Sequence, residues 1–184
     1  MRLNRNIKIL LYGSNLWYFS EGMLGPLFAI FTERVGGSVL DISWAWATYL
    51  IVTGLLYILI GKITDEKYNP AKVMVLGYFM HAIFTFGYLF VNKPWHLFLI
   101  QAALGVSTAL ATPTWYALYS KYGDKGYETF QWGLAGGEGQ ILTAAAIIIG
   151  GFIVNYFSFT ALFIVMGVTQ LIAACYQARI LFRK

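Results

Sequence analysis

The chain has 184 residues, of which 59% are hydrophobic and 11% are charged, and its mean hydropathy is +0.64. Soluble domains are about 45–50% apolar and about 25% charged. The core of a soluble domain of this length could not bury the additional hydrophobic residues. The composition favours an integral membrane protein over a soluble bundle, whose helices would need polar stripes. The net charge of +5 would suit a nucleic-acid-binding protein. The basic residues lie between apolar runs, however, where membrane orientation explains them better.

Six apolar runs are each long enough, at roughly 20 residues, to cross about 30 Å of hydrocarbon. They predict one all-α transmembrane domain spanning residues 1–184, with helices over 9–31, 39–60, 71–91, 95–119, 129–156 and 159–181. Glycine, asparagine and proline occupy several of the breaks. The charged stretch 61–72 predicts a short hydrated turn. The first run is too long for a signal peptide and lacks a small-residue cleavage site, so we expect a retained helix.

The basic residues divide unequally between the two ends of these helices. Eleven Lys and Arg residues fall at the termini and in the second and fourth connections, and only Arg34 and Lys93 fall on the other side. The eleven are Arg2, Arg5, Lys8, Lys62, Lys67, Lys72, Lys121, Lys125, Arg179, Arg183 and Lys184. Because positive residues concentrate in cytoplasmic loops, we expect a multi-pass protein of the plasma or inner membrane with both termini in the cytoplasm.

A faint internal repeat links the two halves of the chain. The spacing of Gly61 and Asp65 recurs at Gly151 and Asn155, and the spacing of Glu21 and Pro26 recurs at Thr108 and Pro113. Three predicted helices lie in each copy, and an odd number inverts the second copy in the membrane. The pattern predicts two inverted three-helix repeats, which many secondary transporters contain.

The charged connection resembles a known family signature. Gly61, Asp65, Lys67 and Lys72 are similar to the loop motif of the major facilitator superfamily, and the segment 147–167 resembles that family's passage from fifth to sixth helix. The chain departs from the motif at Glu66, where a basic residue is usual, and at residues 68–70, which replace the second glycine region. The resemblance implies a cytoplasmic gate at these residues.

The same resemblance raises a question of length, because members of the family contain two six-helix halves with the substrate between them. This chain corresponds to one half. The resemblance therefore implies a homodimer of halves, a half that pairs with a different six-helix protein, or a membrane protein that does not transport.

Two carboxyl groups lie inside predicted membrane helices, where ionisable residues are costly and are functional candidates by default. Glu21 is about 18 Å and Glu138 about 14 Å along their helices at 1.5 Å per residue. A carboxyl group near the membrane midplane can take up and release a proton. The alternative for each is a protonated side chain that only hydrogen-bonds a neighbouring helix. Trp17, Tyr18, Gly25 and Phe28 share the face of Glu21, and an acid among aromatic rings suits a lipophilic cation.

A polar stripe marks the fourth predicted helix. Its members recur at steps of three and four and so share one face: Gln101, Gly105, Thr108, Thr112, Trp115 and Tyr119. Ordinary helix packing is the alternative. By resemblance, the first and fourth helices line the cavity, which places Glu21 on the substrate path and Glu138 near the contact between halves. By the same resemblance the third helix is peripheral, so we expect a packing role for His81.

The fifth predicted helix is rich in glycine. Gly133 and Gly137 have the spacing that allows close backbone approach between membrane helices, either within the chain or at a dimer seam. By resemblance the seam joins this helix to the second helix of a partner, with Asp65 near that partner's helix terminus.

Other chemistry is not predicted. The two histidines and the single Cys175 have no metal-ligand spacing, and we expect no metal, no cofactor, no nucleic-acid partner and no enzymatic activity. The sequence predicts a secondary active transporter of a small solute, proton-coupled and working by alternating access as a homodimer. The alternatives are a transporter with a different six-helix partner and a membrane scaffold or assembly protein.

Overall fold

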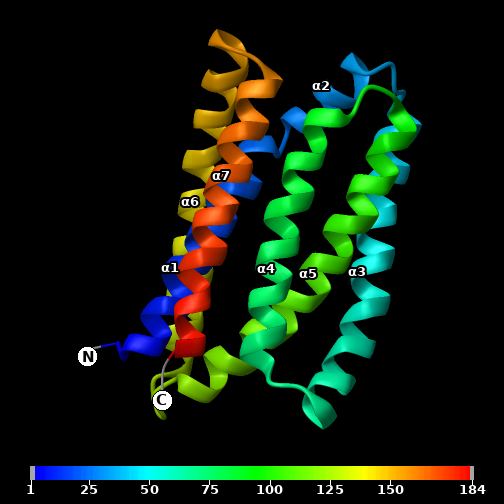
Figure 1. Cartoon of the computed structure of the whole chain (residues 1–184). Coiled ribbons are helices and arrows are strands. Elements are labelled where there is room, and N and C mark those ends of the chain that lie inside the picture. The colour runs from blue at the N-terminus through cyan, green and yellow to red at the C-terminus, as the bar shows by residue number, and fades with distance from the viewer. Residues whose placement is uncertain (1–2, 183–184) are drawn as a thin grey trace.

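The computed structural model describes residues 3–182, and all of its regular elements are helices. Seven α-helices and two short 3₁₀ helices follow one another along this part of the chain (Figure 1). They are α1 (Arg5–Leu24), α2 (Leu27–Arg34), α3 (Val39–Lys67), α4 (Pro70–Gly87), η1 (Tyr88–Phe90), α5 (Pro94–Tyr122), α6 (Glu128–Tyr156), α7 (Phe159–Ala178) and η2 (Arg179–Phe182). Arg2, Arg183 and Lys184, which were counted in the charge asymmetry, lie outside the described residues.

Five helical segments of the described chain are long and apolar enough to cross a membrane. They are Val39–Lys67, Pro70–Phe90, Pro94–Tyr122, Glu128–Tyr156 and Phe159–Phe182. The expected first span is not among them. Its N-terminal part, α1, includes polar residues such as Asn15, Ser20 and Glu21, and the helix ends at Leu24.

The first predicted helix, 9–31, is interrupted in the structure. It begins earlier, at Arg5, and stops at Leu24, and a turn at Gly25 and Pro26 leads into α2. Proline has no N–H to donate and its ring clashes with the carbonyl one turn back, which explains the break. Pro113 does not break α5, where the hydroxyl of Thr114 donates to the carbonyls of Leu110 and Ala111.

The charged stretch 61–72 is mostly helical, so the prediction of a hydrated turn there was wrong. Helix α3 continues seven residues past its expected end, through Gly61 and Asp65 to Lys67. The N–H of Tyr68 still donates to the carbonyl of Thr64, and the break comes at Asn69, whose side chain caps α4. A 29-residue helix at 1.5 Å per residue exceeds the hydrocarbon thickness, so its charged last turns can lie in water.

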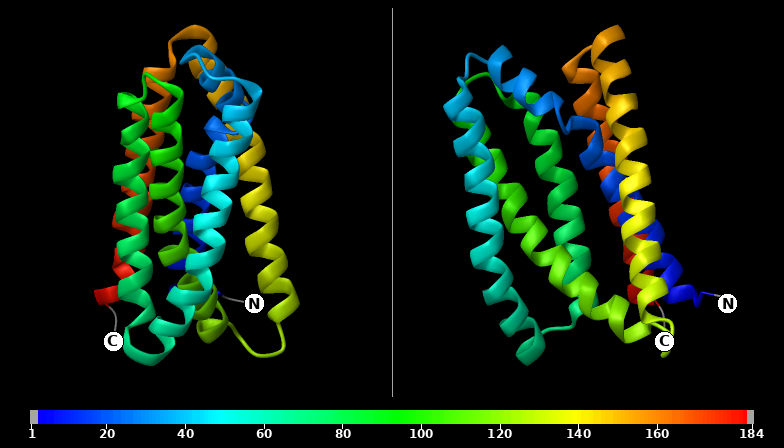
Figure 2. Two further views of the ribbon diagram at one scale, coloured as in Figure 1. Left: turned by 90° about the vertical axis from the view of Figure 1, so that its right-hand side faces the viewer. Right: turned by 180° about the vertical axis from the view of Figure 1, so that it is seen from behind.

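The helices pack as two groups of three. Helix α1 packs against α6 and α7, α5 packs against α3 and α4, and α4 packs against α7 to join the groups. These pairings are unchanged when α1, α3 and α4 are exchanged with α5, α6 and α7 respectively. In the right panel of Figure 2, α3 and α6 stand at the two sides of one face, with α5, α4 and the upper part of α1 seen between them and the lower part of α1 behind α6.

The two ends of the bundle differ. Both ends of the described chain lie at one end, together with the α3–α4 and α5–α6 connections (Figure 1). Two apolar clusters fill the bundle, one including Leu10 and Trp115 and the other including Met23 and Leu104. Along α1 and α5 the polar residues Glu21 and Ser107 fall between the clusters, so a polar layer separates the two halves of the core.

Candidate substrate and proton site

Glu21 and His81 form a close pair in the polar layer. The Oε1 atom of Glu21 lies 2.7 Å from the Nε2 atom of His81. The histidine side chain is fully buried, whereas 38% of the Glu21 side chain is exposed. The other ring nitrogen, Nδ1, lies 3.0 Å from the hydroxyl oxygen of Ser107. The carboxyl group therefore keeps one side open to water while a buried imidazole holds the other.

Aromatic side chains hold this pair in place. The ring of Trp17 lies 3.9 Å from the ring of His81 and 4.6 Å from the ring of Tyr78, measured between centroids. Trp17 and Glu21 are one turn apart on α1, while Tyr78 and His81 are three apart on α4. Residues three and four apart are neighbours on a helix surface, so long side chains from one face of α1 meet side chains from one face of α4 here.

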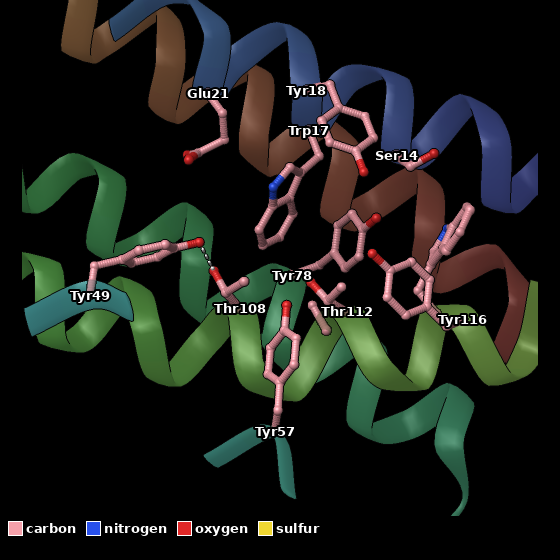
Figure 3. Close-up of a pocket in the computed structure, with 12 residues that line it drawn as sticks. Ser14, Trp17, Tyr18, Glu21, Tyr49, Tyr57, Tyr78, Thr108, Thr112 and Tyr116 are labelled. Atoms are coloured by element: carbon pink, nitrogen blue, oxygen red, sulfur yellow. Dashed lines mark hydrogen bonds between the residues drawn. The ribbon is translucent and has the colours of Figure 1, made fainter. Parts of the chain in front are cut away.

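A cavity of about 280 Å³ opens beside the pair on the side of the chain termini, and we call it the near cavity. Its lining is mainly aromatic and hydroxyl-bearing, with Glu21 as the acid (Figure 3). In Figure 3, Tyr57 reaches from α3 toward Thr112, and Tyr18 and Tyr116 approach from α1 and α5. The lining residues are Ser14, Trp17, Tyr18, Glu21, Tyr49, Tyr57, Tyr78, Thr108, Ala111, Thr112, Trp115 and Tyr116.

A second cavity of about 100 Å³, the far cavity, lies beyond the pair on the opposite side. It is lined by Glu21, Leu24, Gly25, Phe28, Trp46, Tyr49, Tyr88, Gln101, Leu104 and Met166. Along α1 and α5, the near-cavity residues are closer to the end of the bundle that holds the termini. The two cavities are thus stacked along the helices, and Glu21 and Tyr49 line both.

Tyr49 belongs to the partition between the two cavities. Its hydroxyl oxygen lies 3.3 Å from that of Thr108, the bond drawn in Figure 3. One turn along α3, the hydroxyl of Thr53 donates to the carbonyl of Gly105. A side chain at Gly105 would be 3.0 Å from the carbonyl oxygen of Tyr49, so this glycine lets α3 and α5 approach closely.

The structure brings most of the predicted site residues together. Trp17, Tyr18, Thr108, Thr112 and Trp115 line the near cavity with Glu21, and Gln101 lines the far cavity.

Glu138 lies apart from this group. It accepts a hydrogen bond of 2.6 Å from the side-chain amide of Asn15 and is among the lining residues of neither cavity. The structure therefore gives Glu138 a polar partner on α1 rather than a place beside Glu21.

Sequence reasoning missed His81 and the tyrosines of α3. His81 was expected to have a packing role, but it contacts the candidate acid directly. A signal for α3 was present, since Tyr49, Thr53 and Tyr57 recur every four residues and so share a helix face. On α4, Tyr78, His81 and Thr85 also recur at steps of three and four. That spacing does not show which helices this face meets, and the partners of His81 come from two other helices.

The residues of the loop motif lie at the end of the bundle that holds the termini. Gly61 and Asp65, in the last turns of α3, border a small cavity whose other lining includes Pro113, Thr114 and Ala117 of α5. Lys67 ends α3, and Lys72 lies in the first turn of α4.

The glycines of α6 fall into two kinds. Gly133, Gly136 and Gly137 face open space, since a side chain added there would meet nothing within 4 Å. At Gly150, by contrast, an added Cβ atom would be 2.1 Å from the carbonyl oxygen of Met23. Internal packing therefore uses Gly150 and leaves Gly133 and Gly137 free.

Residues 3–182 contain no group of three or more His, Cys, Asp or Glu side chains that could hold a metal ion. Long apolar helices around an acid–histidine pair and two stacked cavities define a multi-pass helical membrane protein.

Comparison with known proteins identifies the family. The family model described as Major Facilitator Superfamily matches residues 10–184, and the chain belongs to this family of membrane transporters. At 184 residues it has half the usual length.

Three relatives illustrate the relation. The uncharacterized MFS-type transporter YitZ of Bacillus subtilis is 20% identical over 79% of this chain and 88% of its own length. The uncharacterized MFS-type transporter MJ1560 of Methanocaldococcus jannaschii is 21% identical over 61% of this chain and 29% of its own length. The multidrug resistance protein MdtG of Salmonella schwarzengrund is 24% identical over 51% of this chain and 24% of its own length. The match thus spans most of the first relative and less than a third of the other two.

Proposed function

We propose that the chain is a six-crossing half of a secondary active transporter, which exchanges protons for a small solute by alternating access. One observation carries this proposal: Glu21 is a lining residue of both stacked cavities. A group that can be reached from either cavity can bind a proton on one side of the membrane and release it on the other. In this account α1 and α2 together form the sixth crossing.

Two further features support alternating access. The helix pairings are unchanged when α1, α3 and α4 are exchanged with α5, α6 and α7, as expected for inverted repeats whose relative movement opens a central site to each side in turn. Tyr49 lies between the cavities, and its hydroxyl group makes a long hydrogen bond of 3.3 Å to Thr108. Breaking that bond costs little, since a typical net contribution is about 0.5–1.5 kcal/mol.

The lining of the near cavity favours a lipophilic cation as the solute. Seven of its residues are Trp or Tyr and Glu21 is its acid; aromatic faces attract cations, and the carboxylate supplies the opposite charge. The relative MdtG is a multidrug resistance protein, which agrees with a solute of this kind.

A second copy of the chain supplies the other wall of the transport path in this proposal. Only 11% and 17% of the residues in the apolar windows of α3 and α6 are buried, against 44–50% in α4, α5 and α7. Those two helices flank the face on which α1 and α5 lie (Figure 2). A partner on that face would cover α3 and α6, including Gly133 and Gly137, and would enclose both cavities.

Orientation in the membrane follows the basic residues. Lys62, Lys67 and Lys121 lie at or near the connections that share an end with the termini (Figure 1). We place this end, with its Asp65 motif, in the cytoplasm of the cell because positive residues concentrate there.

Proton release on cation binding tests the role of Glu21. Tetraphenylphosphonium is titrated into the purified chain in lipid nanodiscs, and calorimetry is repeated in buffers that differ in ionisation enthalpy. We expect wild type to release a proton for each cation bound, and Glu21→Gln to release none. Glu33→Gln, at an exposed acid of α2, is the matched control and should behave as wild type. Proton release that persists in Glu21→Gln would refute the assignment.

A further inference from the structure

We propose that Glu21 and His81 hold the coupling proton as one unit, and that Ser107 fixes which ring nitrogen shares it. The inference rests on the proposed function for its place in transport, but the geometry that carries it is independent of any solute. It makes His81 a positioning residue for the carboxyl group that faces the cavities.

The hydroxyl of Ser107 determines the proton on Nδ1. This hydroxyl donates to the carbonyl oxygen of Leu104 at 2.8 Å, as serine in a helix commonly does. Its single hydrogen is therefore used, and its oxygen can only accept from the histidine ring 3.0 Å away. The Nδ1 atom of His81 must then be the donor and must bear a hydrogen.

The second step concerns Nε2. In a neutral imidazole one nitrogen donates and the other accepts, so a hydrogen on Nδ1 leaves Nε2 with a lone pair. Nε2 lies 2.7 Å from Oε1 of Glu21, a contact that needs a hydrogen between the two atoms. That hydrogen belongs either to a protonated Glu21 or to an imidazolium ring, and in both forms the pair holds one proton more than a carboxylate beside a neutral ring.

Loss of that proton breaks the contact. A carboxylate oxygen and a ring lone pair repel each other, and His81 cannot turn to a new partner without leaving Ser107. Glu21 can move, because its side chain is 38% exposed and lines both cavities. Release of the proton to cavity water thus frees the carboxylate for a cation, and rebinding of a proton draws it back to His81. Proton and cation then exclude each other at one carboxyl group.

The surroundings contain little that competes for this proton. The neighbouring titratable side chains are tyrosines, which ordinarily stay neutral at physiological pH: Tyr18, Tyr49, Tyr57, Tyr78, Tyr88 and Tyr116. From α7 the far cavity receives the uncharged Met166. The acid on α6, Glu138, is bonded to Asn15.

Nitrogen-15 NMR of the histidine ring tests the unit directly. The chain has two histidines, so His96→Gln leaves His81 as the only one once any purification tag is removed. In this background we expect Nδ1 to stay protonated across the titration while Nε2 loses its proton. Adding Glu21→Gln should move the Nε2 midpoint by about 1 pH unit or more, the size of coupling that defines an interacting pair. An unchanged midpoint would overturn the inference.

Ser107→Ala provides a second variant that preserves Glu21. It removes the acceptor for Nδ1. Once the pair has lost its shared proton, the neutral ring should therefore carry its hydrogen on Nε2, where it can donate to the Glu21 carboxylate, and the nitrogen shifts distinguish the two forms. A ring that keeps its hydrogen on Nδ1 in this variant would also overturn the inference. Helix content by circular dichroism checks that each variant is folded.

The proposed function can fail separately. If Glu21→Gln shifts the Nε2 midpoint but tetraphenylphosphonium never removes the Nε2 proton, the paired unit stands and cation exchange fails. If cation binding releases a proton that depends on Glu21, but Glu21→Gln leaves the Nε2 midpoint unchanged, cation exchange stands and the paired unit fails.

Discussion

Neighbouring glycines on α6 show how sharply surroundings differ at the scale of one residue. An added Cβ atom at Gly150 would overlap the backbone of Met23 on α1, at 2.1 Å from its carbonyl oxygen. At Gly151 it would meet nothing within 4 Å. Backbone atoms cannot rotate away as a flexible side chain can, so only the first substitution forces α1 and α6 apart.

This contrast predicts opposite effects of two matched substitutions. Gly150→Ala should destabilise the fold by roughly 1–3 kcal/mol, the usual cost of overpacking, and should lower the Tm. Gly151→Ala should leave the Tm unchanged or raise it, because alanine favours a helix by about 1 kcal/mol over glycine. Thermal unfolding in nanodiscs measures both, and equal Tm values would contradict the close α1–α6 contact.

Some candidate site residues could be predicted from the sequence because their residue type is unusual within an apolar helix. Glu21 was predicted because an acid is costly within an apolar run, and the helical repeat of α5 placed Thr108, Thr112 and Trp115 on one face. His81 was not predicted as its partner, because their contact joins positions 60 residues apart. Periodicity within a helix carries no information on which neighbouring helix its face will meet.

At the scale of helices, the sequence predicted most spans and missed where two of them end. Apolar length identified five segments that the structure confirms as long and apolar enough to cross a membrane. Charge within 61–67 suggested a loop, yet α3 continues there because its backbone hydrogen bonds remain intact. Hydropathy predicts whether a segment lies in lipid or in water, but not whether its backbone is helical. The part of a helix that extends into water can therefore be mistaken for a loop.

The exposed face of α6 leads to a prediction about assembly. If a second copy packs its α3 on this face, Gly137→Cys and Ile58→Cys in one chain should cross-link through a short bis-maleimide into a dimer. Both positions are open, Ile58 being 78% exposed and Gly137 free of neighbours. Cys175 is replaced by serine so that only the new thiols react. Electrophoresis of nanodisc samples measures the dimer fraction.

A matched control moves one thiol to the opposite side of the chain. Ile83→Cys on α4 is also exposed, at 64%, and combined with Gly137→Cys it should give little dimer. Equal cross-linking in both pairs would contradict a specific seam. A monomer in both would favour a different six-helix partner.

At the scale of the whole molecule, the arrangement is one of two matching groups of helices around a polar layer. The layer holds Glu21, His81 and Ser107, with one apolar cluster on each side. Such a layer is costly in a membrane protein unless its groups are bonded to one another, and here they are. In a transporter, the central site must be stable when it is closed to both sides of the membrane, and it must also become accessible from each side in turn.

The most direct measurement of the central claim is uptake of radiolabelled tetraphenylphosphonium by liposomes that contain the purified chain, driven by an imposed pH gradient. The membrane potential is clamped with potassium and valinomycin. We predict uptake for wild type and for Glu33→Gln that collapses when the gradient is dissipated, and uptake at the level of empty liposomes for Glu21→Gln. Gradient-driven uptake by Glu21→Gln equal to wild type would contradict proton-coupled transport through Glu21.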